Sequence, residues 1–425
     1  MTVAGPRWIH TSFLDPTPGG SGLASHTATP PRDRYRVISR TIRRVLPAAS
    51  SERARDDCCP GVLRLIDAVD GGLARIRLPG GLLGADALRA LAAATRHLGD
   101  GRLELTSRAS VQIRALADGA GAELAERLAA AGLWPSESHE RVRNIAASPL
   151  AGLDSGADLT ELVRDLDRTL CARPALAQLS GRFLFGLDDG RGDIAALEPD
   201  VLAVVSADAQ VGGLPVSPER VVEALLAFAE AFLAERADQR SDAWRVTDLA
   251  DGVARVRARA AMQLGVLTPG ETPAAPVWPD TPPAGLIDQL GGGHALVALA
   301  PLGRLTADQA DWLAAAITGR SARVTPWRSI VVPDVAPTLL AAAEAAGFGI
   351  AADSPWRTIS ACAGRPGCGK ALADVQHDAL AAAGRWPGRL VHWSGCERRC
   401  GRPARTEVDV VATEHGYRIE DAADA

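Results

Sequence analysis

Four of the seven cysteines in this 425-residue chain lie close together near its C-terminus. Five residues separate Cys362 from Cys368, three separate Cys396 from Cys400, and twenty-seven lie between the two pairs. Two thiol pairs at such spacings predict a site in which four thiolates bind one metal centre. Tetrahedral zinc sites usually leave two to four residues between paired ligands, so the second pair fits zinc better than the first. Iron–sulfur clusters also use four thiolates and accept wider spacings.

The residues around these cysteines are small. Glycines stand beside both pairs, at positions 364, 367, 369, 395 and 401. Backbone without side chains can approach a bulky inorganic cube closely. This composition therefore favours a [4Fe–4S] cluster whose ligands are Cys362, Cys368, Cys396 and Cys400. A structural zinc site remains the alternative.

The same stretch contains a partial phosphate-binding motif. Residues 364–370, GRPGCGK, have the G-x-x-x-x-G-K spacing of a loop that cradles phosphates. However, the Ser or Thr that should follow and hold magnesium is Ala371, and Cys368 inside the motif is already a predicted metal ligand. The sequence therefore disfavours nucleotide binding here.

The composition narrows the class of protein. With 47% apolar residues the chain can bury a large core, and its length favours two or more domains. The formal net charge of −5 gives no electrostatic support for a nucleic-acid partner. No apolar run is long enough to span a membrane, and the N-terminus lacks a signal-peptide pattern. We therefore expect a cytoplasmic protein without membrane or nucleic-acid partners, whose odd number of cysteines serves thiolate chemistry in a reducing compartment.

The first ordered unit is expected to begin near Pro60. Residues 1–56 are rich in Pro, Ser, Thr and Gly without an apolar period, so we expect a disordered extension or a mis-assigned start there. Two alternating strand patterns then flank the hairpin signal Asp70-Gly71-Gly72. A helix at 85–97, a strand–turn–strand at 102–116 and a helix at 121–131 follow. This order predicts an α+β fold, with helices on one face of a sheet.

This unit is repeated later in the chain. Residues 77–91 resemble residues 299–313 at a shift of 222 positions, and residues 105–110 resemble residues 324–329 at a shift of 219. The repeat continues into the cysteine stretch, because residues 142–148 align with residues 356–362 and place Ser148 at the position of Cys362. Such a repeat predicts two similar halves around a pseudo-twofold axis, with the metal in only one half and a functional cleft between them.

The segments between and after the repeats have their own elements. We expect helices at 158–171 and 377–384, strands within 181–189, 200–213 and 407–413, and a helix that Ser217 caps and Pro218 opens. The predicted divisions are an extension at 1–56, half-domains at 57–135 and 286–345, a module without a cluster at 136–264, a Pro-rich linker at 265–285 and a cluster module at 346–425.

The chain resembles the nitrite and sulfite reductase superfamily. The resemblance covers nearly everything from Cys59 onward and rests on the repeated unit, on RLPGG at 77–81, and on the motifs ACAGRPGC at 361–368 and GCERRCGRP at 395–403. Within the superfamily, CPGVLR at 59–64 and TPWRSIVVP at 325–333 make it most similar to the precorrin-3B synthases, which are oxygen-dependent monooxygenases of aerobic cobalamin biosynthesis. The resemblance implies duplicated ferredoxin-like half-domains and two reductase-type α/β modules.

The resemblance also implies a tetrapyrrole substrate. In sirohaem-bearing relatives a positive cleft holds the carboxylates of the macrocycle, and a precorrin carries many acetate and propionate arms, which guanidinium forks bind bidentately. The substrate-binding residues implied here are the arginines Arg75, Arg77, Arg108, Arg143, Arg182 and Arg328. The first two stand at i and i+2 of one expected strand, so they share a face.

The anion-reducing relatives carry a K-F-K pattern that this chain lacks in part. The matching residues 181–185 read GRFLF, where Arg182 can stand for the first lysine but Leu184 has no charge. A small anion in a partly buried site needs paired positive donors, so sirohaem-dependent nitrite or sulfite reduction is disfavoured. The implied reaction is instead the hydroxylation of precorrin-3A at a meso carbon by O2, with lactone formation from a neighbouring acetate. A non-catalytic protein with structural zinc is a further alternative.

The implied cofactors follow from this reaction. A [4Fe–4S] cluster would pass electrons singly from an NAD(P)H-linked electron-donor protein. The resemblance also implies a non-haem iron, for which the sequence shows no clear 2-His-1-carboxylate pattern. Sirohaem is an alternative cofactor, and no catalytic residue can be assigned. His392, four residues before Cys396, is expected to be a hydrogen-bonding or core residue rather than a ligand.

Overall fold

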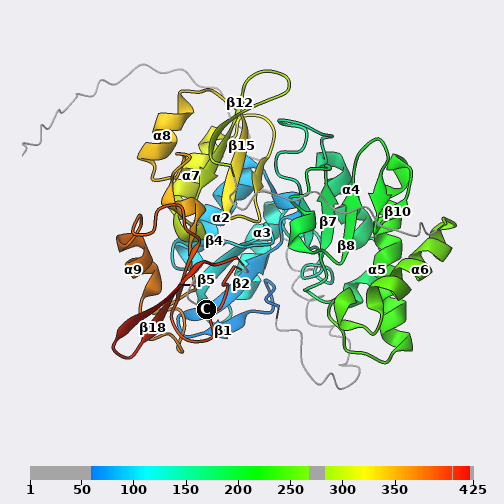
Figure 1. Cartoon of the computed structure of the whole chain (residues 1–425), viewed down its shortest axis with the longest axis horizontal. Coiled ribbons are helices and arrows are strands. Elements are labelled where there is room, and N and C mark those ends of the chain that lie inside the picture. The colour runs from blue at the N-terminus through cyan, green and yellow to red at the C-terminus, as the bar shows by residue number, and fades with distance from the viewer. Residues whose placement is uncertain (1–58, 268–282, 404, 422–425) are drawn as a thin grey trace, which may run out of the picture. The chain divides into compact units, whose positions relative to one another are not determined.

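The computed structural model describes residues 59–267, 283–403 and 405–421. All of them belong to one of the chain's two compact units, Ala54–Ala425. The predicted extension at 1–56 and most of the predicted linker at 265–285 lie outside these residues. Helices and separate sheets both occur in the described part of the chain, which confirms the predicted α+β class (Figure 1).

The sheet of the first half-domain has the strand order β1-β2-β5-β4-β13. β1 (Ile66–Ala68) and β2 (Gly71–Ile76) form the predicted hairpin, and Gly71 takes a φ of 120°, a conformation that glycine adopts most easily. β5 (Val111–Leu116) and β4 (Arg102–Leu105) continue the sheet. The last strand, β13 (Arg304–Thr306), comes from the second repeat.

The sheet of the second half-domain has the matching order β11-β12-β15-β14-β3. Four of its strands belong to the second repeat: β11 (Gly285–Asp288), β12 (His294–Leu299), β15 (Ser329–Val335) and β14 (Ala322–Val324). The fifth, β3 (Leu82–Leu83), comes from the first repeat and pairs with β14. Each half-domain therefore lends one strand to the other, so neither sheet is complete without its counterpart.

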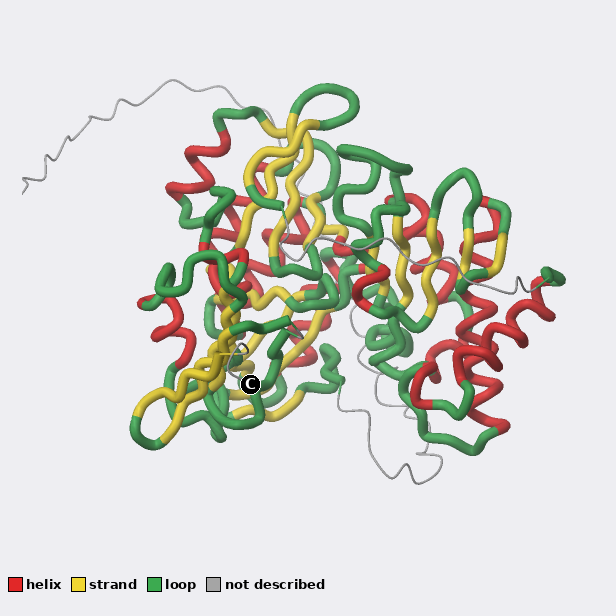
Figure 2. Tube along the Cα trace, in the orientation of Figure 1, coloured by secondary structure: helices red, strands yellow, loops and turns green. Residues whose placement is uncertain are grey.

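The helices of the half-domains share one core. α2 (Ala85–Leu98) and α3 (Ala120–Ala130) confirm the predicted helices, and α2 packs against α7 (Ala307–Ala316) of the second repeat. Leu88, Leu91 and Leu313 are buried in a cluster that also contains apolar residues from the sheets of both half-domains. In Figure 2 these helices and the strands they cover are distinguished by colour. The two half-domains are thus held together by apolar burial as well as by strand exchange.

The other two sheets repeat a single topology. β6 (Ile145–Ala147), β7 (Phe185–Asp188) and β8 (Val201–Val204) are parallel, and β9 (Gln210–Val211) returns antiparallel, with β10 (Leu214–Pro215) at the edge. β16 (Ile359–Ala361), β17 (Val391–Ser394), β18 (Val408–Thr413) and β19 (Gly416–Asp421) pair in the same way. The N–H of Ser148 donates to Leu187 O at 3.0 Å and that of Cys362 to Trp393 O at 2.9 Å. These matching contacts confirm that Ser148 occupies the position of Cys362.

Helices complete these two modules. α4 (Thr160–Cys171), α5 (Val221–Asp238) and α6 (Gly252–Leu264) belong to the first module, α9 (Val375–Ala381) belongs to the second, and α8 (Leu339–Ala345) precedes it. Ser217 was expected to cap α5, but a 3-10 turn at Pro218–Arg220 comes first and the Ser217 side chain makes no capping bond. α9 begins earlier than predicted, because the Asp374 side chain accepts a hydrogen bond from His377 N and starts the helix there.

Candidate functional site

Two parallel strands bring the cysteine pairs together. Cys362 follows β16 and Cys396 stands two residues after β17, so both lie at the carboxyl ends of neighbouring parallel strands. The Gly395 N–H donates to Cys362 Sγ at 3.1 Å, which fixes the second cysteine loop against the first. Cys362 interacts electrostatically with both Cys368 and Cys400. Three of the four cysteines are half-buried and Cys400 is exposed.

Glycines allow the two cysteine loops to pack closely. The Leu372 N–H donates to Gly395 O at 2.8 Å, and a Cβ at Gly395 would lie 2.7 Å from the Ala371 Cβ. Gly364 has a φ of 64°, and a Cβ there would lie 2.8 Å from Val375. Real Cβ atoms do not approach other atoms so closely. The small residues that the sequence places around the cysteines are therefore required by the loop packing itself.

The described cysteine sulfurs are not gathered as closely as a single zinc ion would hold them. Within the described ranges, no three cysteine sulfurs lie mutually within 4.8 Å. Zinc–sulfur bonds of about 2.3 Å in a tetrahedral site would hold the sulfurs only about 3.8 Å apart. A cubane carries its thiolates on separate irons and spaces them more widely. Burial raises the pKa of the Cys362 thiol, so its thiolate form needs a bound cation for stabilisation.

Unpaired polar atoms mark the strand that leads to the second cysteine pair. Trp393 Nε1 and Ser394 Oγ on β17 are buried and have no hydrogen-bond partner among the described residues, and His392 interacts with the backbone of Cys400. The His392 ring is fully buried, its Nδ1 lies 2.8 Å from Ser360 Oγ, and burial lowers its pKa to about 4. Its burial agrees with the predicted core role. Buried polar atoms rarely go unpaired, so β17 is suited to contact a polar group at the cysteine end.

Two of the predicted arginines lie on the face of the first sheet opposite its helices. Arg75 of β2 and Arg77, the residue that follows β2, alternate with Ala74 and Ile76, which are buried in the helical core. The carboxamide oxygen of Gln112, the strand partner of Arg75, accepts from Arg75 Nε and Nη2 at 3.0 and 2.8 Å. Burial lowers the pKa of Arg75. The shared face expected from the i, i+2 spacing is therefore confirmed.

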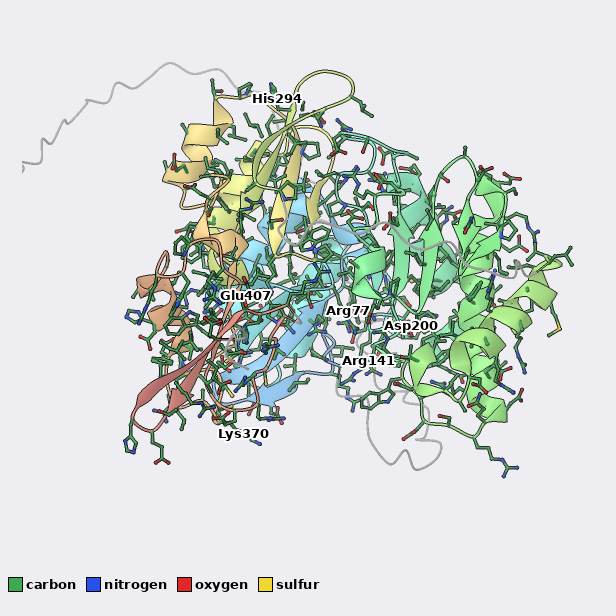
Figure 3. All side chains as sticks on the ribbon, in the orientation of Figure 1. Arg77, Arg141, Asp200, His294, Lys370 and Glu407 are labelled. Atoms are coloured by element: carbon green, nitrogen blue, oxygen red, sulfur yellow. The ribbon has the colours of Figure 1, made fainter. Side chains whose placement is uncertain are left out.

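Arg77 is the most deeply buried of the set, with 3% of its surface exposed. Its Nε donates to Asn144 Oδ1 at 2.8 Å and its Nη1 donates to Pro60 O at 2.9 Å, while Nη2 is buried without a partner among the described residues. Burial, together with the nearby charge of Arg75, lowers its pKa to about 9. In Figure 3 Arg77 is labelled where the first half-domain meets the first module. The unused donor makes this position ready to receive an anion.

Two further arginines approach from the β4–β5 turn and from the first module. Arg108 Nη1 donates to Gly181 O at 3.4 Å, and burial lowers the pKa of Arg108. Arg108 also lies within electrostatic range of Arg182. Arg182 is exposed and its guanidinium stacks on the Trp244 ring at 4.3 Å. Arg75, Arg77, Arg108 and Arg182 thus form a chain of positive charges, which we call the arginine cluster.

The remaining two predicted arginines lie apart from the arginine cluster. Arg143 is buried and forms a bidentate ion pair with Asp167 of α4, with both N–O distances at 2.7 Å. The Arg143 guanidinium group is therefore already bound to a carboxylate of the protein. Arg328 is half-buried in a left-handed conformation with a φ of 61°, beside Gly401 and within electrostatic range of Glu104 and His392. It therefore adjoins the second cysteine loop rather than Arg75 and Arg77.

The first cysteine loop packs against the strands that carry the arginine cluster. Arg114 of β5 forms a bidentate ion pair with Asp70, with both bonds at 3.0 Å, and donates from Nη2 to Gly367 O at 2.8 Å. Gly369 lies against Val69 in the β1–β2 hairpin. Gln112 and Arg114 are two residues apart on β5, as are Arg75 of β2 and Arg77 directly after it. The loop that carries Cys368 therefore contacts the edge of the face on which Arg75 lies.

Several residues that organise this region were not predicted. Asn144 accepts from Arg77 and donates from Nδ2 to Gly181 O at 2.9 Å, so it joins β2 to the 181–183 segment. Glu140 accepts from the Val62 N–H and from Trp134 Nε1, and so holds the segment around Val62 in place. In the sequence, the available signal for Asn144 was its place beside Arg143 in the repeated segment 142–148.

Three aspartate side chains lie close enough to one another to suggest a metal site. Asp188, Asp189 and Asp193 bring oxygen atoms within 4.8 Å of one another in the first module. Both oxygens of Asp188 already accept two backbone N–H groups each, and Asp189 binds Arg191. Most of the lone pairs are therefore occupied, and the ligands of the predicted non-haem iron remain unassigned.

Comparisons with known proteins agree with this architecture. Residues 68–131 match the family described as nitrite/sulfite reductase ferredoxin-like half domain. Over 390 residues the chain is 27% identical to a ferredoxin–nitrite reductase from Synechococcus elongatus, covering 80% of this chain and 76% of that protein. Over 400 residues it is 28% identical to a precorrin-3B synthase from Sinorhizobium sp, covering 86% and 82%. The chain is therefore similar to proteins of the nitrite and sulfite reductase superfamily over most of its length.

A solved structure shares the fold. The NirA protein of Mycobacterium tuberculosis superposes with a TM-score of 0.63 at 20% identity, covering 82% of this chain and 74% of that one. The two relatives above differ by one percentage point of identity, so overall similarity does not separate a nitrite reductase from a precorrin-3B synthase. None of the helices in the described ranges has the length and apolarity needed to cross a membrane.

Proposed function

We propose that this protein is an oxygen-dependent monooxygenase that converts precorrin-3A to precorrin-3B. One oxygen atom of O2 enters a meso carbon of the substrate and the other leaves as water, with two electrons and two protons supplied from outside. A neighbouring acetate then closes a lactone on the modified ring. The electrons would come from an NAD(P)H-linked electron-donor protein. A [4Fe–4S] cluster held by Cys362, Cys368, Cys396 and Cys400 would carry these electrons one at a time.

The observation that carries this proposal is the arginine cluster with its unpaired donor. A precorrin presents several carboxylates around a flat ring, and Arg75, Arg77 and Arg108 offer separate guanidinium groups on neighbouring strands and turns. Nη2 of Arg77 is buried with no acceptor within the described structure, and an arriving carboxylate would supply one. Because Arg143 is occupied by Asp167, we leave it out of the proposed binding set.

The residues of the chain would bind and orient the ring. Asn144 and Gln112 hold the Arg77 and Arg75 guanidinium groups in fixed directions, so little side-chain freedom would be lost on binding. The contact between Arg114 and Gly367 keeps the cysteine loop against the same two strands. The bound ring would then lie near the electron carrier.

A sirohaem-dependent nitrite or sulfite reductase is the second candidate. It is favoured by the similar identity to the cyanobacterial nitrite reductase. Against it, Leu184 is 2% exposed and apolar where the second lysine of the K-F-K pattern would stand. Arg182, at the first lysine position, is engaged with Trp244. A small anion would therefore lack the paired positive donors that it needs.

Cofactor content and turnover together test the proposal. Anaerobically purified protein should be brown, contain about four iron and four sulfide per chain, and lack the sharp visible bands of an iron tetrapyrrole. It should consume O2 only when precorrin-3A and a reductant are both present. Sirohaem bands with nitrite-dependent oxidation of the donor would support the second candidate. Zinc without sulfide would overturn the redox function altogether.

A further inference from the structure

A row of polar side chains crosses the first sheet on the face that is turned away from its helices. Its members come from the neighbouring strands β2, β5, β4 and β13 and pair in the order Arg75, Gln112, Glu104 and Arg304. Side chains of directly opposite residues in antiparallel strands lie close enough to interact. The row therefore leads from the arginine cluster at one end to Arg304 at the other.

Arg304 connects this row to the first cysteine of the metal site. Its Nη1 donates to Gln376 Oε1 on α9, and Gln376 Nε2 donates to Cys362 O at 3.1 Å. A guanidinium group can only donate, so the glutamine turns its oxygen to Arg304 and its amino group to the carbonyl oxygen. Arg304 thus fixes the direction of the amide that holds the Cys362 peptide group.

Two carboxylates hold the Arg304 side chain in turn. Its Nη2 donates to Asp100 Oδ2 at 2.9 Å, and its Nε lies 3.4 Å from Glu104 Oε1. Only 18% of the Arg304 side chain and 17% of the Glu104 side chain are exposed. Burial raises the pKa of Glu104, and the charge of Arg304 opposes this shift. Because water reaches the pair only in part, salt screens its charges less than those of a surface ion pair.

Four further charged groups lie within electrostatic range of Glu104, two arginines and two aspartates: Arg114, Arg328, Asp70 and Asp100. Arg114 is bound to Asp70 by two bonds of 3.0 Å, and Asp100 is bound to Arg304. Arg328 adjoins Gly401, the residue after Cys400. Positive and negative groups are thus mixed beside the cysteine loops, so the loss of any one of them changes the net charge there.

The equivalent row of the second sheet is built differently. The strand pairing and the repeat shifts of 222 and 219 give the order Val297, Val331, Arg323 and Leu82. Leu82 stands at the position of Arg304 and carries no charge. Arg323 stands at the position of Glu104 and donates to the backbone oxygens of residues 149 and 151. The pair of opposite charges is therefore confined to the row that leads to the cysteines.

We propose that Arg304 and Glu104 are positioning residues of the cysteine site, and that their opposite charges set the reduction potential of its cluster. The inference rests on the proposed [4Fe–4S] cluster as the electron carrier. The potential of such a cluster depends on the net charge and the hydrogen bonds around it. A positive charge stabilises the electron that the cluster receives, and a negative charge destabilises it. Arg304 therefore raises the potential, and Glu104 lowers it.

Two variants with opposite expected effects test the proposal. A redox titration followed by electron paramagnetic resonance measures the midpoint potential of the cluster in the full-length protein, purified without air. Arg304→Gln should make the cluster about tenfold harder to reduce, which is about 59 mV for a one-electron couple. Glu104→Gln should make it easier to reduce by a similar factor, and the double variant should return towards the unmodified potential. Because both single variants break the same ion pair, a merely structural role would shift both potentials in one direction. That result, or the absence of any shift, would overturn the proposal.

A matched variant controls for the loss of an ion-paired arginine. Arg320→Gln breaks a bidentate pair with Asp334 in the second half-domain, so the potential should stay unchanged. Gln376→Leu removes the amide but neither charge, so it should shift the potential less than the charge variants and speed the loss of the cluster in air. An unchanged rate of loss would show that Gln376 does not hold the Cys362 loop.

Iron and sulfide analysis of the same samples separates the two ways in which the idea can fail. Unmodified protein without a cluster would overturn the proposed function. A cluster whose potential does not respond to these variants would overturn this inference alone. If Arg304→Gln does not fold, which thermal unfolding shows, then Glu104→Gln still decides the sign of the shift, and a lowered or unchanged potential in that variant would contradict the proposal.

Discussion

The two half-domains carry the same sheet face with opposite chemistry. In the first sheet, Arg75 and Gln112 occupy the face turned away from the helices. The repeat shifts of 222 and 219 place Val297 and Val331 at the equivalent positions of the second sheet, and the strand pairs Arg75–Gln112 and Val297–Val331 confirm this register. At these two positions, one copy of the face therefore carries an arginine and a glutamine, and the other carries two valines.

What covers each face explains the difference. Leu150 and Leu153 from the first module pack against Val297 and Val331, so the second face is buried by apolar contact. The first face meets a cysteine loop through Arg114 and Gly367, and Arg77 keeps an unused donor among the described residues. Burying a charge without a partner is costly. At the positions of Arg75 and Gln112 the second copy is therefore closed by apolar side chains, whereas the first copy keeps a donor that an anion could accept from.

The loops that follow β6 and β16 differ in the same way. The Asp189 N–H donates to Ser148 Oγ at 3.2 Å, as the Gly395 N–H donates to Cys362 Sγ at 3.1 Å. In the first module the Ser148 hydroxyl then donates to Asp193 Oδ1 at 2.5 Å. The backbone hydrogen bond is thus the same in both loops. Carboxylate side chains fill the loop after β6, whereas glycines in the loop after β16 leave room for a cofactor.

Exchanging the equivalent residues should have the largest effect. Cys362→Ser gives the second module the residue of the first, and we expect loss of the cluster, because one of its four thiolates is gone. The matched change, Ser148→Cys, should not create a second cluster, since no other cysteine lies in that loop. Iron and sulfide analysis of anaerobically purified proteins checks both. Full cluster content in Cys362→Ser would refute the ligand assignment, as it would for Cys396→Ser.

Removing one charge of the arginine cluster should weaken ligand binding. Arg77→Gln should lower the affinity for a polycarboxylate tetrapyrrole about 10- to 100-fold, because a hydrogen bond to a charged group contributes about 1.5–3 kcal/mol. Fluorescence titration measures this affinity.

The control for this change is Arg143→Gln. It breaks the ion pair with Asp167 and should lower the melting temperature while leaving the affinity unchanged. If the two variants lose affinity equally, the comparison between the arginine cluster and the occupied Arg143 does not hold.

Asp193 should make the free energy of unfolding depend on pH. Burial raises the pKa of Asp193 to about 7, whereas an aspartate in the unfolded chain ionises near pH 3.9. Between these values the folded protein keeps a proton that the unfolded chain has lost. The contribution of this group to the free energy of unfolding should therefore fall as pH rises, by about 1.4 kcal/mol per unit.

Asp193→Asn tests this dependence, because it removes the ionisable group. Relative to the unmodified protein, its melting temperature should improve between pH 5 and pH 8. A stability difference between the two proteins that stays constant over this range would show that Asp193 does not titrate there. The cysteine loop provides no counterpart to this carboxyl group, so its cluster content should be the same in both proteins.

Filling the space in the cysteine loop should have the smallest effect. Gly395→Ala places a Cβ against Ala371 and should cost about 1–3 kcal/mol of stability through overpacking. We expect the cluster to form but to bleach faster in air, which visible absorbance records. Gly84→Ala is the control, because a Cβ there would contact nothing within 4 Å. Equal bleaching rates in both variants would remove the steric argument.

Local sequence patterns allowed much of the fold and of the candidate site to be predicted. The cysteine loops, the hairpin at Asp70 and the alternation of Arg75 with Arg77 depend on spacings of a few residues, and the repeat gave the equivalence of Ser148 and Cys362. The ion pair of Arg143 could not be predicted in the same way. Its partner Asp167 stands 24 positions later on α4, and the contact exists only after that helix has packed against β6.

The exchange of β3 and β13 has a consequence for how the chain must fold. Glu104 pairs with Arg304, two hundred positions further on, and Leu83 pairs with Ala322. Until synthesis has passed these positions, β4 is left with an open hydrogen-bonding edge, a place where chains can pair wrongly. Contacts between such distant positions also slow folding, because a long loop must close before they form. We therefore expect a fragment that ends before residue 285 to aggregate rather than to behave as an independent domain.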